Sequence, residues 1–248
     1  EMSEAPYVLL LNTDCLISKN TIPKLIKHLE NEKNVGLICP ISSNAANLSF
    51  DILPNYSYMQ VNEIFEENFK GMSFPACTVV GNCLMITREC IEKVGFLDEI
   101  YGMGYGEETD YHFKTLDKGL KAKVAIDTYV FHKAEVSFGT SKLKQERLSK
   151  NRKIFFNRWG KEYDKCYQQY KKNDPVEYIK RNITENDKKI TVSTLFYLPD
   201  IHQNAGGCHM VSDMINYMVI NGYSANILYH NIVNYKEIMV FNPIHIKM

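Results

Sequence analysis

Carboxylates and a histidine follow apolar segments at three points of the chain, where they could bind a cation or move a proton. Asp14 comes three residues after the apolar run 7–11. Such a run predicts a buried central strand of a parallel sheet, and open α/β sheets bind ligands beyond the carboxyl ends of their strands. Oxygen ligands there suit a hard divalent cation. Asp14 would equally serve as the cap of the next helix or turn.

The second group is acidic and opens a predicted helix at 107–118: Glu107, Glu108 and Asp110. Carboxylates this close repel one another, which raises the pKa of one of them and produces a general base. The positive end of a helix dipole also favours acids in a first turn, so the cluster alone has a structural explanation. The glycines at 102, 104 and 106 do not form a dinucleotide-binding fingerprint and indicate a flexible lip instead.

The third candidate is His132, which directly follows the short apolar run 129–131. An imidazole there could be a further metal ligand or contact a phosphate. A lone histidine after a strand is more commonly a structural residue.

An α/β framework must position these side chains. Apolar runs predict strands at 7–11, 35–39 (ended by Pro40), 79–87 (broken at Gly81 and Asn82), 121–126 and 129–131. Helical spacing and stop signals predict helices at 22–31, 61–69, 88–94, 107–118 and 141–159.

A new pattern begins after a polar segment at 161–189. A strand at 190–198, a loop at 199–207, a helix at 208–220 and a strand at 224–229 would form a βαβ unit. The predicted domains are therefore 1–160, a linker or helical connection at 161–189, and a second, truncated domain at 190–248. Both ends of the sequence suggest a piece of a longer protein.

Composition narrows the class of protein. The 248 residues are 45% hydrophobic and carry 29 basic and 29 acidic side chains, which excludes the basic excess expected of a nucleic-acid binder. No apolar run approaches the roughly 20 residues of a membrane-spanning helix. Seven cysteines without a C-x-x-C motif predict reduced thiols and a cytoplasmic location.

Taken together and in order, the motifs resemble glycosyltransferase family 2, in its rhamnosyltransferase-like branch. The matching segments, over roughly residues 5–140, are Leu11–Cys15 (family L-N-x-D-T), Gly81–Arg88, Gly95–Glu99, Glu107–Lys114 (family E-D-x-D-x-x-x-R) and His132. Two departures are Glu108 in place of Asp and Lys114 in place of Arg, which loses a bidentate fork.

The resemblance implies a partial GT-A fold, an α/β mixed sheet with flanking helices, and roles for individual residues. Asp14 and His132 would hold Mg²⁺ or Mn²⁺ and the donor diphosphate, with Asn12 beside them. Glu108 would deprotonate the acceptor hydroxyl. The remaining positions would lie on the acceptor side or behind Glu108: Gly81, Asn82, Glu107 and Asp110.

The implied activity is inverting, metal-assisted transfer of a sugar from a UDP-, dTDP- or GDP-sugar to a glycan or polyprenyl-diphosphate-linked acceptor, in bacterial surface polysaccharide synthesis. The family's nucleotide-binding units would precede Asp14, so the fragment alone would be inactive. The alternatives are a non-catalytic module that binds a glycan or a partner, and a nucleotidyltransferase of similar fold.

The last 60 residues resemble the start of a GT-B glycosyltransferase of family 4, a second Rossmann-like domain. The resemblance depends on Pro199, the pair Gly206 and Gly207 before a helix, and Gly222 with Tyr223. An ordinary βαβ turn is the competing explanation. The basic helix at 142–158 is interpreted as a solvated face; its alternative is peripheral contact with the inner face of a membrane.

Overall fold

The computed structural model describes residues 4–51, 53, 56–102, 104–133, 142–183, 193–202, 214, 224–233 and 244–247. Side chains are described up to residue 183, apart from 142–144, and at 214. The chain forms two compact units, the first comprising 1–51 and 65–182 and the second 52–64 and 183–248.

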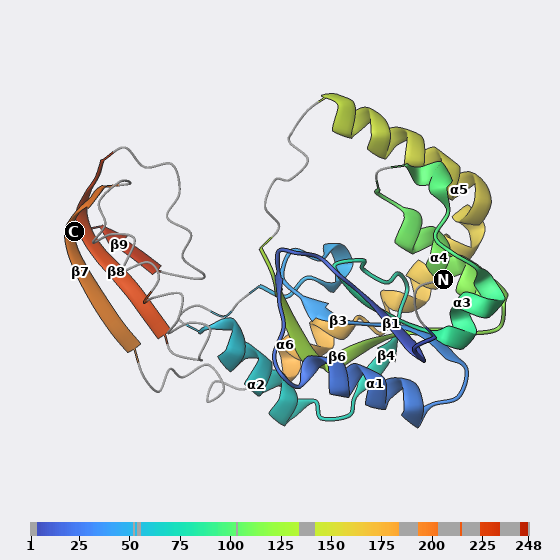
Figure 1. Cartoon of the computed structure of the whole chain (residues 1–248), viewed down its shortest axis with the longest axis horizontal. Coiled ribbons are helices and arrows are strands. Elements are labelled where there is room, and N and C mark those ends of the chain that lie inside the picture. The colour runs from blue at the N-terminus through green and yellow to red at the C-terminus, as the bar shows by residue number, and fades with distance from the viewer. Residues whose placement is uncertain are drawn as a thin grey trace. The chain divides into compact units, whose positions relative to one another are not determined.

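The first unit is built on a six-stranded mixed sheet (Figure 1). Its strands are β1 (Tyr7–Leu11), β2 (Cys15–Leu16), β3 (Val35–Ser42), β4 (Ser73–Pro75), β5 (Cys83–Thr87) and β6 (Lys121–His132). The order is β1-β5-β3-β6-β2, and β4 also pairs with β6. Among the paired strands of this sheet that the structure describes, β3 and β6 are the one parallel pair, and the other neighbouring strands pair antiparallel. The α/β class with a mixed sheet and flanking helices is therefore confirmed.

The strand before Asp14 differs from its prediction. It was expected to be a buried central strand of parallel type, but among the described residues β1 pairs only with β5, and antiparallel. Its side chains are half-buried, and Leu11 is exposed. An apolar run indicates that a segment is buried, but it does not indicate how many strands lie beside it or in which direction they run.

β3 is the central strand, and all eight of its residues are buried. It was predicted to end before Pro40, yet it continues to Ser42. Proline lacks an amide hydrogen and is tolerated where a ladder is irregular. The pairing with β6 shifts register between Pro40 and Ile41, so the missing donor falls at that irregularity.

β6 is one long strand where two short strands were predicted. Its register against β3 passes from Ala125 to Tyr129 while β3 advances by one residue. The bulged segment includes Asp127, whose carboxylate accepts hydrogen bonds from the Gly71 amide and the His28 ring, both at 2.8 Å. The bulge bends the strand, so that its first half pairs with β4 and its end pairs with β2.

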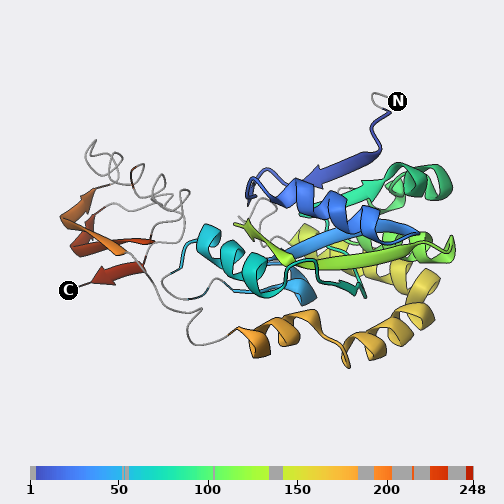
Figure 2. The ribbon, with the colours of Figure 1, turned by 90° about the horizontal axis from the view of Figure 1, so that it is seen from below.

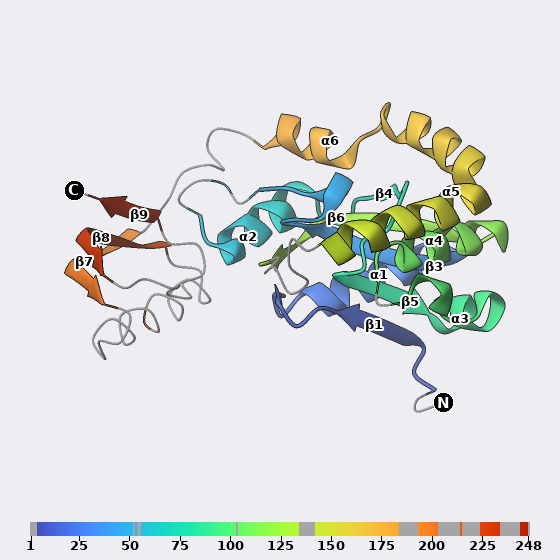
Figure 3. The ribbon, with the colours of Figure 1, turned by 90° about the horizontal axis from the view of Figure 1, so that it is seen from above.

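Helices cover both faces of the sheet. The α1 helix (Thr21–Asn31) is seen in front of the strands from below, and α4 (Glu107–Asp117) and α5 (Lys142–Tyr170) are in front of them from above (Figures 2 and 3). The short α3 helix (Arg88–Val94) contacts β3 and β5. Under α1, Leu25 and Leu29 pack on the core of Val35, Ile38, Cys83, Met85, Ala125 and Val130. Each large buried side chain contributes about 1.5–3 kcal/mol.

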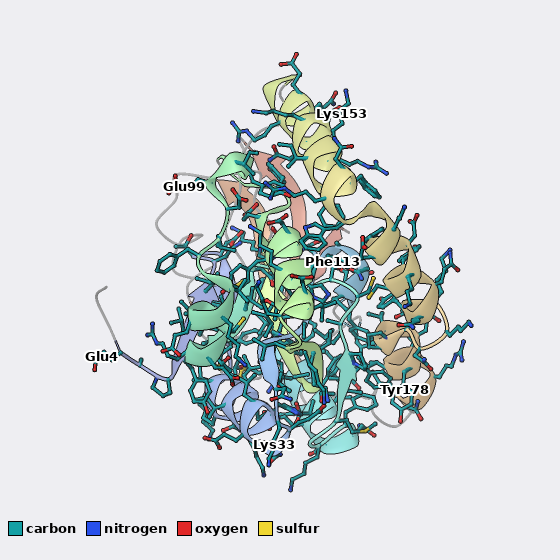
Figure 4. The ribbon with its side chains drawn as sticks, turned by 90° about the vertical axis from the view of Figure 1, so that its right-hand side faces the viewer. Glu4, Lys33, Glu99, Phe113, Lys153 and Tyr178 are labelled. Carbon is teal, nitrogen blue, oxygen red and sulfur yellow. The ribbon has the colours of Figure 1, made fainter. Side chains whose placement is uncertain are left out.

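The helix α5 continues past the predicted domain boundary at 160 and ends at Tyr170. Its inner side chains pack on α4: Phe113 stacks on Trp159 with ring centroids 6.0 Å apart, and Phe155 lies 5.6 Å from Phe113. Figure 4 labels Phe113 within this packing and Lys153 on the outer part of α5. Residues 161–182, predicted as a linker or helical connection, are largely helical, include α6 (Pro175–Asn182), and group with the first unit.

The second unit contains three parallel strands in the order β7-β8-β9. They are β7 (Ser193–His202), β8 (Ser224–Val233) and β9 (Ile244–Lys247). β7 runs through Pro199, where a loop was predicted. The predicted helix at 208–220 and the pair Gly206 and Gly207 lie outside the described residues, apart from helical Met214.

The α2 helix (Tyr58–Asn68), near the predicted 61–69, is divided between the two units at residue 64. Two short 3-10 helices, η1 (Ala46–Leu48) and η2 (Glu99–Tyr101), complete the described elements. Within the part of the chain that the structure describes, no helix is both long and apolar enough to cross a membrane.

Candidate functional site

Asp14 and His132 meet where β2 pairs with the end of β6. The antiparallel register places Cys15 opposite His132, and the Lys133 amide donates to the Asp14 carbonyl at 3.0 Å. His132 Nε2 lies 3.4 Å from Asp14 Oδ2. Their side chains are 14% and 22% exposed, so the pair is accessible to a ligand from solvent. The structure thus brings together the two residues predicted to hold a cation.

The backbone around His132 fixes its ring. His132 Nδ1 lies 3.2 Å from the Asn44 carbonyl, which can only accept a hydrogen bond, so Nδ1 carries the proton. The backbone of His132 is held as well, because its amide donates to Ser43 Oγ at 2.8 Å and its carbonyl accepts from Asn44 Nδ2 at 2.8 Å. With Nδ1 bonded in this way, Nε2 is the ring nitrogen that faces Asp14.

This orientation creates a requirement for positive charge. A lone pair on Nε2 and a carboxylate oxygen are both acceptors, and they face each other at 3.4 Å. Either a second proton on the ring or a bound cation satisfies them. A backbone carbonyl holding the far nitrogen of a histidine is the usual outer support of a metal-bound imidazole.

Cys15 is a third potential ligand beside this pair. One ligand atom each from Asp14, Cys15 and His132 lie within 4.8 Å of one another. The Cys15 thiol donates to the Asn82 carbonyl at 3.4 Å, and burial together with the neighbouring Asp14 charge raises its pKa to about 12. The donor set of oxygen, nitrogen and sulfur fits a divalent cation, and it does not by itself select Mg²⁺ or Mn²⁺.

The segment of Gly81 and Asn82 connects this group to the sheet. The Asn82 carbonyl also accepts the Asn12 amide at 2.9 Å, so it joins both ends of the β1–β2 turn. The Asn82 side chain is buried and donates to Ser42 Oγ at 2.8 Å. Asn82 therefore supports Asn12 and Cys15 from within, and its amide does not face solvent.

Glu108 lies beside Gly81. A Cβ added to Gly81 would be 3.6 Å from Glu108 Cγ, an ordinary van der Waals contact, so the two residues are direct neighbours. One carboxyl oxygen of Glu108 is buried with no hydrogen-bond partner among the described residues, and so is one of Glu107. Burial, followed by the charge of Glu107, raises the pKa of Glu108 to about 7. A carboxyl poised near neutrality suits a general base.

Asp110 faces the α4–α5 interface. Its fully buried carboxylate accepts hydrogen bonds from Tyr101 Oη at 3.0 Å and Trp159 Nε1 at 2.8 Å, and it pairs with Lys114 at 2.9 Å and Arg158 at 3.1 Å. Burial opposes its charge, but these donors outweigh burial and lower its pKa. Asp110 therefore holds α4 against α5, one turn behind the acidic residues that begin the helix.

Lys114 occupies the position of the arginine in the resembled motif. It bridges Asp98 at 3.0 Å and Asp110, and Arg158 of α5 reaches the same two carboxylates. The guanidinium of Arg158 and the ammonium of Lys114 therefore pair with the same two carboxylates. Sequence reasoning did not identify Arg158, nor did it identify Ser43 and Asn44 as the residues that orient His132, because these contacts join segments far apart in the chain. Cys15 could have been noticed, since it directly follows Asp14.

No known protein-family model matches the chain, and no curated protein matches it.

Proposed function

We propose that the first unit is the catalytic part of an inverting, cation-assisted glycosyltransferase of GT-A type. The observation that carries the proposal is that a carboxylate–imidazole pair and a half-buried glutamate both lie near the short segment of Gly81 and Asn82. Asp14 and His132 form the pair, their neighbour Cys15 contacts the Asn82 carbonyl, and Glu108 packs beside Gly81.

The two parts have complementary roles in sugar transfer. Asp14 and the lone pair on His132 Nε2 would hold Mg²⁺ or Mn²⁺, which offsets the charge that develops on a departing nucleoside diphosphate. Glu108 removes the proton of the acceptor hydroxyl as its oxygen attacks the anomeric carbon. Attack opposite the leaving group inverts the configuration and needs no covalent intermediate on the protein.

The donor in this proposal is a UDP-, dTDP- or GDP-sugar, and the acceptor is a glycan or a polyprenyl-diphosphate-linked glycan of a bacterial surface polysaccharide. The parallel strands β7, β8 and β9 support a second, Rossmann-like unit of GT-B type after the first. The choice of substrates and the assignment of the second unit both rest on the resemblance in sequence to known glycosyltransferase families.

Release of nucleoside diphosphate tests the proposal. A full-length protein that contains this chain is incubated with a panel of nucleotide sugars, Mn²⁺ and a polyprenyl-diphosphate glycan, with and without EDTA. We expect EDTA and Asp14→Ala to abolish release, and Glu108→Gln to lower kcat by about 10²–10⁴-fold. The matched control is Asp117→Asn, an exposed carboxylate on the same helix as Glu108, which should leave the rate unchanged.

Release that is indifferent to EDTA and to both substitutions would contradict the proposal. Binding of glycan without any turnover would favour a non-catalytic module. Release of pyrophosphate from a sugar phosphate and a nucleoside triphosphate would favour a nucleotidyltransferase.

A further inference from the structure

Two thiols and a histidine meet in the first unit at a place that the proposed function does not use. Cys77 follows β4, His112 lies on α4 and Cys166 lies on α5. Cys77 and His112 are buried, whereas Cys166 is partly exposed. Cys166 Sγ lies 3.8 Å from the Cys77 carbonyl and 3.9 Å from that of Ala76, so the side chain of α5 reaches the backbone of the other cysteine.

His112 is a buried polar group without a structural explanation. Its side chain is fully buried, and neither ring nitrogen has a hydrogen-bond partner among the described residues. Buried polar groups are normally paired because an unpaired one loses its hydration without compensation. The ring interacts with the nearby thiol of Cys166 and favours its thiolate form.

Cys166 differs from the other described thiols in its acidity. Interaction with the Cys77 thiol, and then with His112, lowers the pKa of Cys166, although burial opposes the shift. The same interaction raises the pKa of Cys77, which keeps its proton. Burial instead raises the pKa of the remaining described thiols: Cys15, Cys39, Cys83 and Cys90. The thiolate is the reactive form of cysteine.

Cys166 is also reachable by a small oxidant. It lines a cavity of about 340 Å³ between α4 and α5, together with Phe113, Leu116, Asp117, Trp159, Glu162, Lys165 and Gln169. Exposure and thiolate character together determine which cysteines oxidise first. Cys77 is buried, its carbonyl lies 3.8 Å from Cys166 Sγ, and the two thiols interact, as a resolving thiol requires.

We propose that Cys166 is an oxidant-sensitive thiol and that Cys77 is its resolving partner. Hydrogen peroxide oxidises the Cys166 thiol to a sulfenic acid and is itself reduced to water. The Cys77 sulfur then attacks the Cys166 sulfur, hydroxide leaves and takes up the Cys77 proton as water, and a disulfide joins the two residues. The bond would tie the segment that leads to Gly81 and Asn82 to α5. The inference is independent of the proposed glycosyltransferase activity.

Peptide mass spectrometry tests the pair. The reduced chain is exposed to hydrogen peroxide, remaining thiols are alkylated, and tryptic peptides are analysed without reduction. We expect residues 71–88 joined to residues 166–171 with the loss of two hydrogens. Because peptide 71–88 also contains Cys83, the matched variants are Cys77→Ser, which should abolish the cross-link, and Cys83→Ser, which should retain it.

Two further measurements separate the redox pair from a merely structural cluster. In Cys77→Ser, dimedone should trap a sulfenic acid on Cys166. In His112→Phe, which keeps a buried ring, alkylation of Cys166 by iodoacetamide at pH 7 should slow by about tenfold or more. Circular dichroism establishes that each variant is folded. A cross-link that persists in Cys77→Ser, or oxidation of Cys166 no faster than that of buried Cys90, would overturn the proposal.

Discussion

At the scale of single residues, Glu108 combines two properties that a general base requires. It packs beside Gly81 with one carboxyl oxygen buried, and its pKa is raised to about 7 by burial and by Glu107. Glutamate is one methylene longer than the aspartate of the resembled motif.

The raised pKa of Glu108 predicts the pH dependence of the proposed reaction. The carboxylate is the active form, so kcat/KM should rise with pH through about 7 and then reach a plateau. Initial rates of nucleoside diphosphate release between pH 5 and pH 9 measure this profile at saturating cation. In Glu107→Gln, which removes the neighbouring charge, the rising limb should move to lower pH.

The raised pKa of Glu108 also predicts how the free energy of unfolding changes with pH. Its folded pKa lies above the ordinary 4.5, so the folded chain binds a proton more tightly than the unfolded chain between pH 4.5 and about 7. Glu108 should therefore destabilise the fold as pH rises through that interval, and Glu108→Gln should remove this slope. An unchanged kinetic profile in Glu107→Gln, together with an unchanged stability slope in Glu108→Gln, would contradict the assignment.

At the scale of elements, α4 is the helix on which the proposed chemistry depends. Its first turn carries Glu107 and Glu108, and its next residues include Asp110 and His112, which face the neighbouring elements. The buried carboxylate of Asp110 pairs with Arg158 of α5 and with Lys114 of the same helix. The orientation of Glu108 therefore depends on how α5 holds α4.

Removing the charge of Asp110 should loosen this contact. Asp110→Asn leaves Lys114 and Arg158 with Asp98 alone and points amide hydrogens at donor groups. Breaking a buried ion pair costs about 3–5 kcal/mol; because both partners are partly exposed, we expect about 3 kcal/mol in the free energy of unfolding. Urea denaturation measures it. Exposed Asp117→Asn should change stability by less than about 0.5 kcal/mol, and equal effects would contradict the role assigned to Asp110.

At the scale of the whole molecule, several carboxylates stabilise the folded first unit only while they are ionised. Arg158 and Lys114 lower the pKa of Asp98, and Lys121 and Lys123 lower that of Glu32 to about 2. Burial opposes the charge of Asp127, but the His28 ring, the Gly71 amide and Lys24 outweigh it, so its pKa is also lowered. Asp127 stabilises the bulge of β6, and Asp98 stabilises the contact between α4 and α5.

The depressed pKa values predict acid lability. Their contribution is complete above the unfolded pKa of about 4 and is lost as pH falls through the folded values. The free energy of unfolding, measured by urea denaturation, should therefore fall as pH drops from about 4 toward about 2. The deficit of Asp127→Asn relative to the unsubstituted chain should be largest near pH 7 and should shrink at pH 3. If the loss of unfolding free energy in Asp127→Asn is the same at every pH, the charge of Asp127 does not contribute to stability.

The sequence by itself determined the α/β class, the helices α1, α3 and α4 to within about two residues, and Asp14, Glu108 and His132 as candidates. These follow from local signals, since helical periodicity, capping residues and strand-end polar groups are written in neighbouring positions. It also predicted strand positions along most of the first unit, because apolar runs mark buried segments wherever they occur.

Only the tertiary structure decided the direction of β1, the continuation of β3 through Pro40, and the length of α5. It alone placed His132 Nε2 toward Asp14, with Asn44 fixing the ring, and grouped Cys77, His112 and Cys166. Each of these depends on pairing or contact between segments tens of residues apart. Local pattern carries no information about such contacts, because burial constrains how apolar a residue is and not which distant residue covers it.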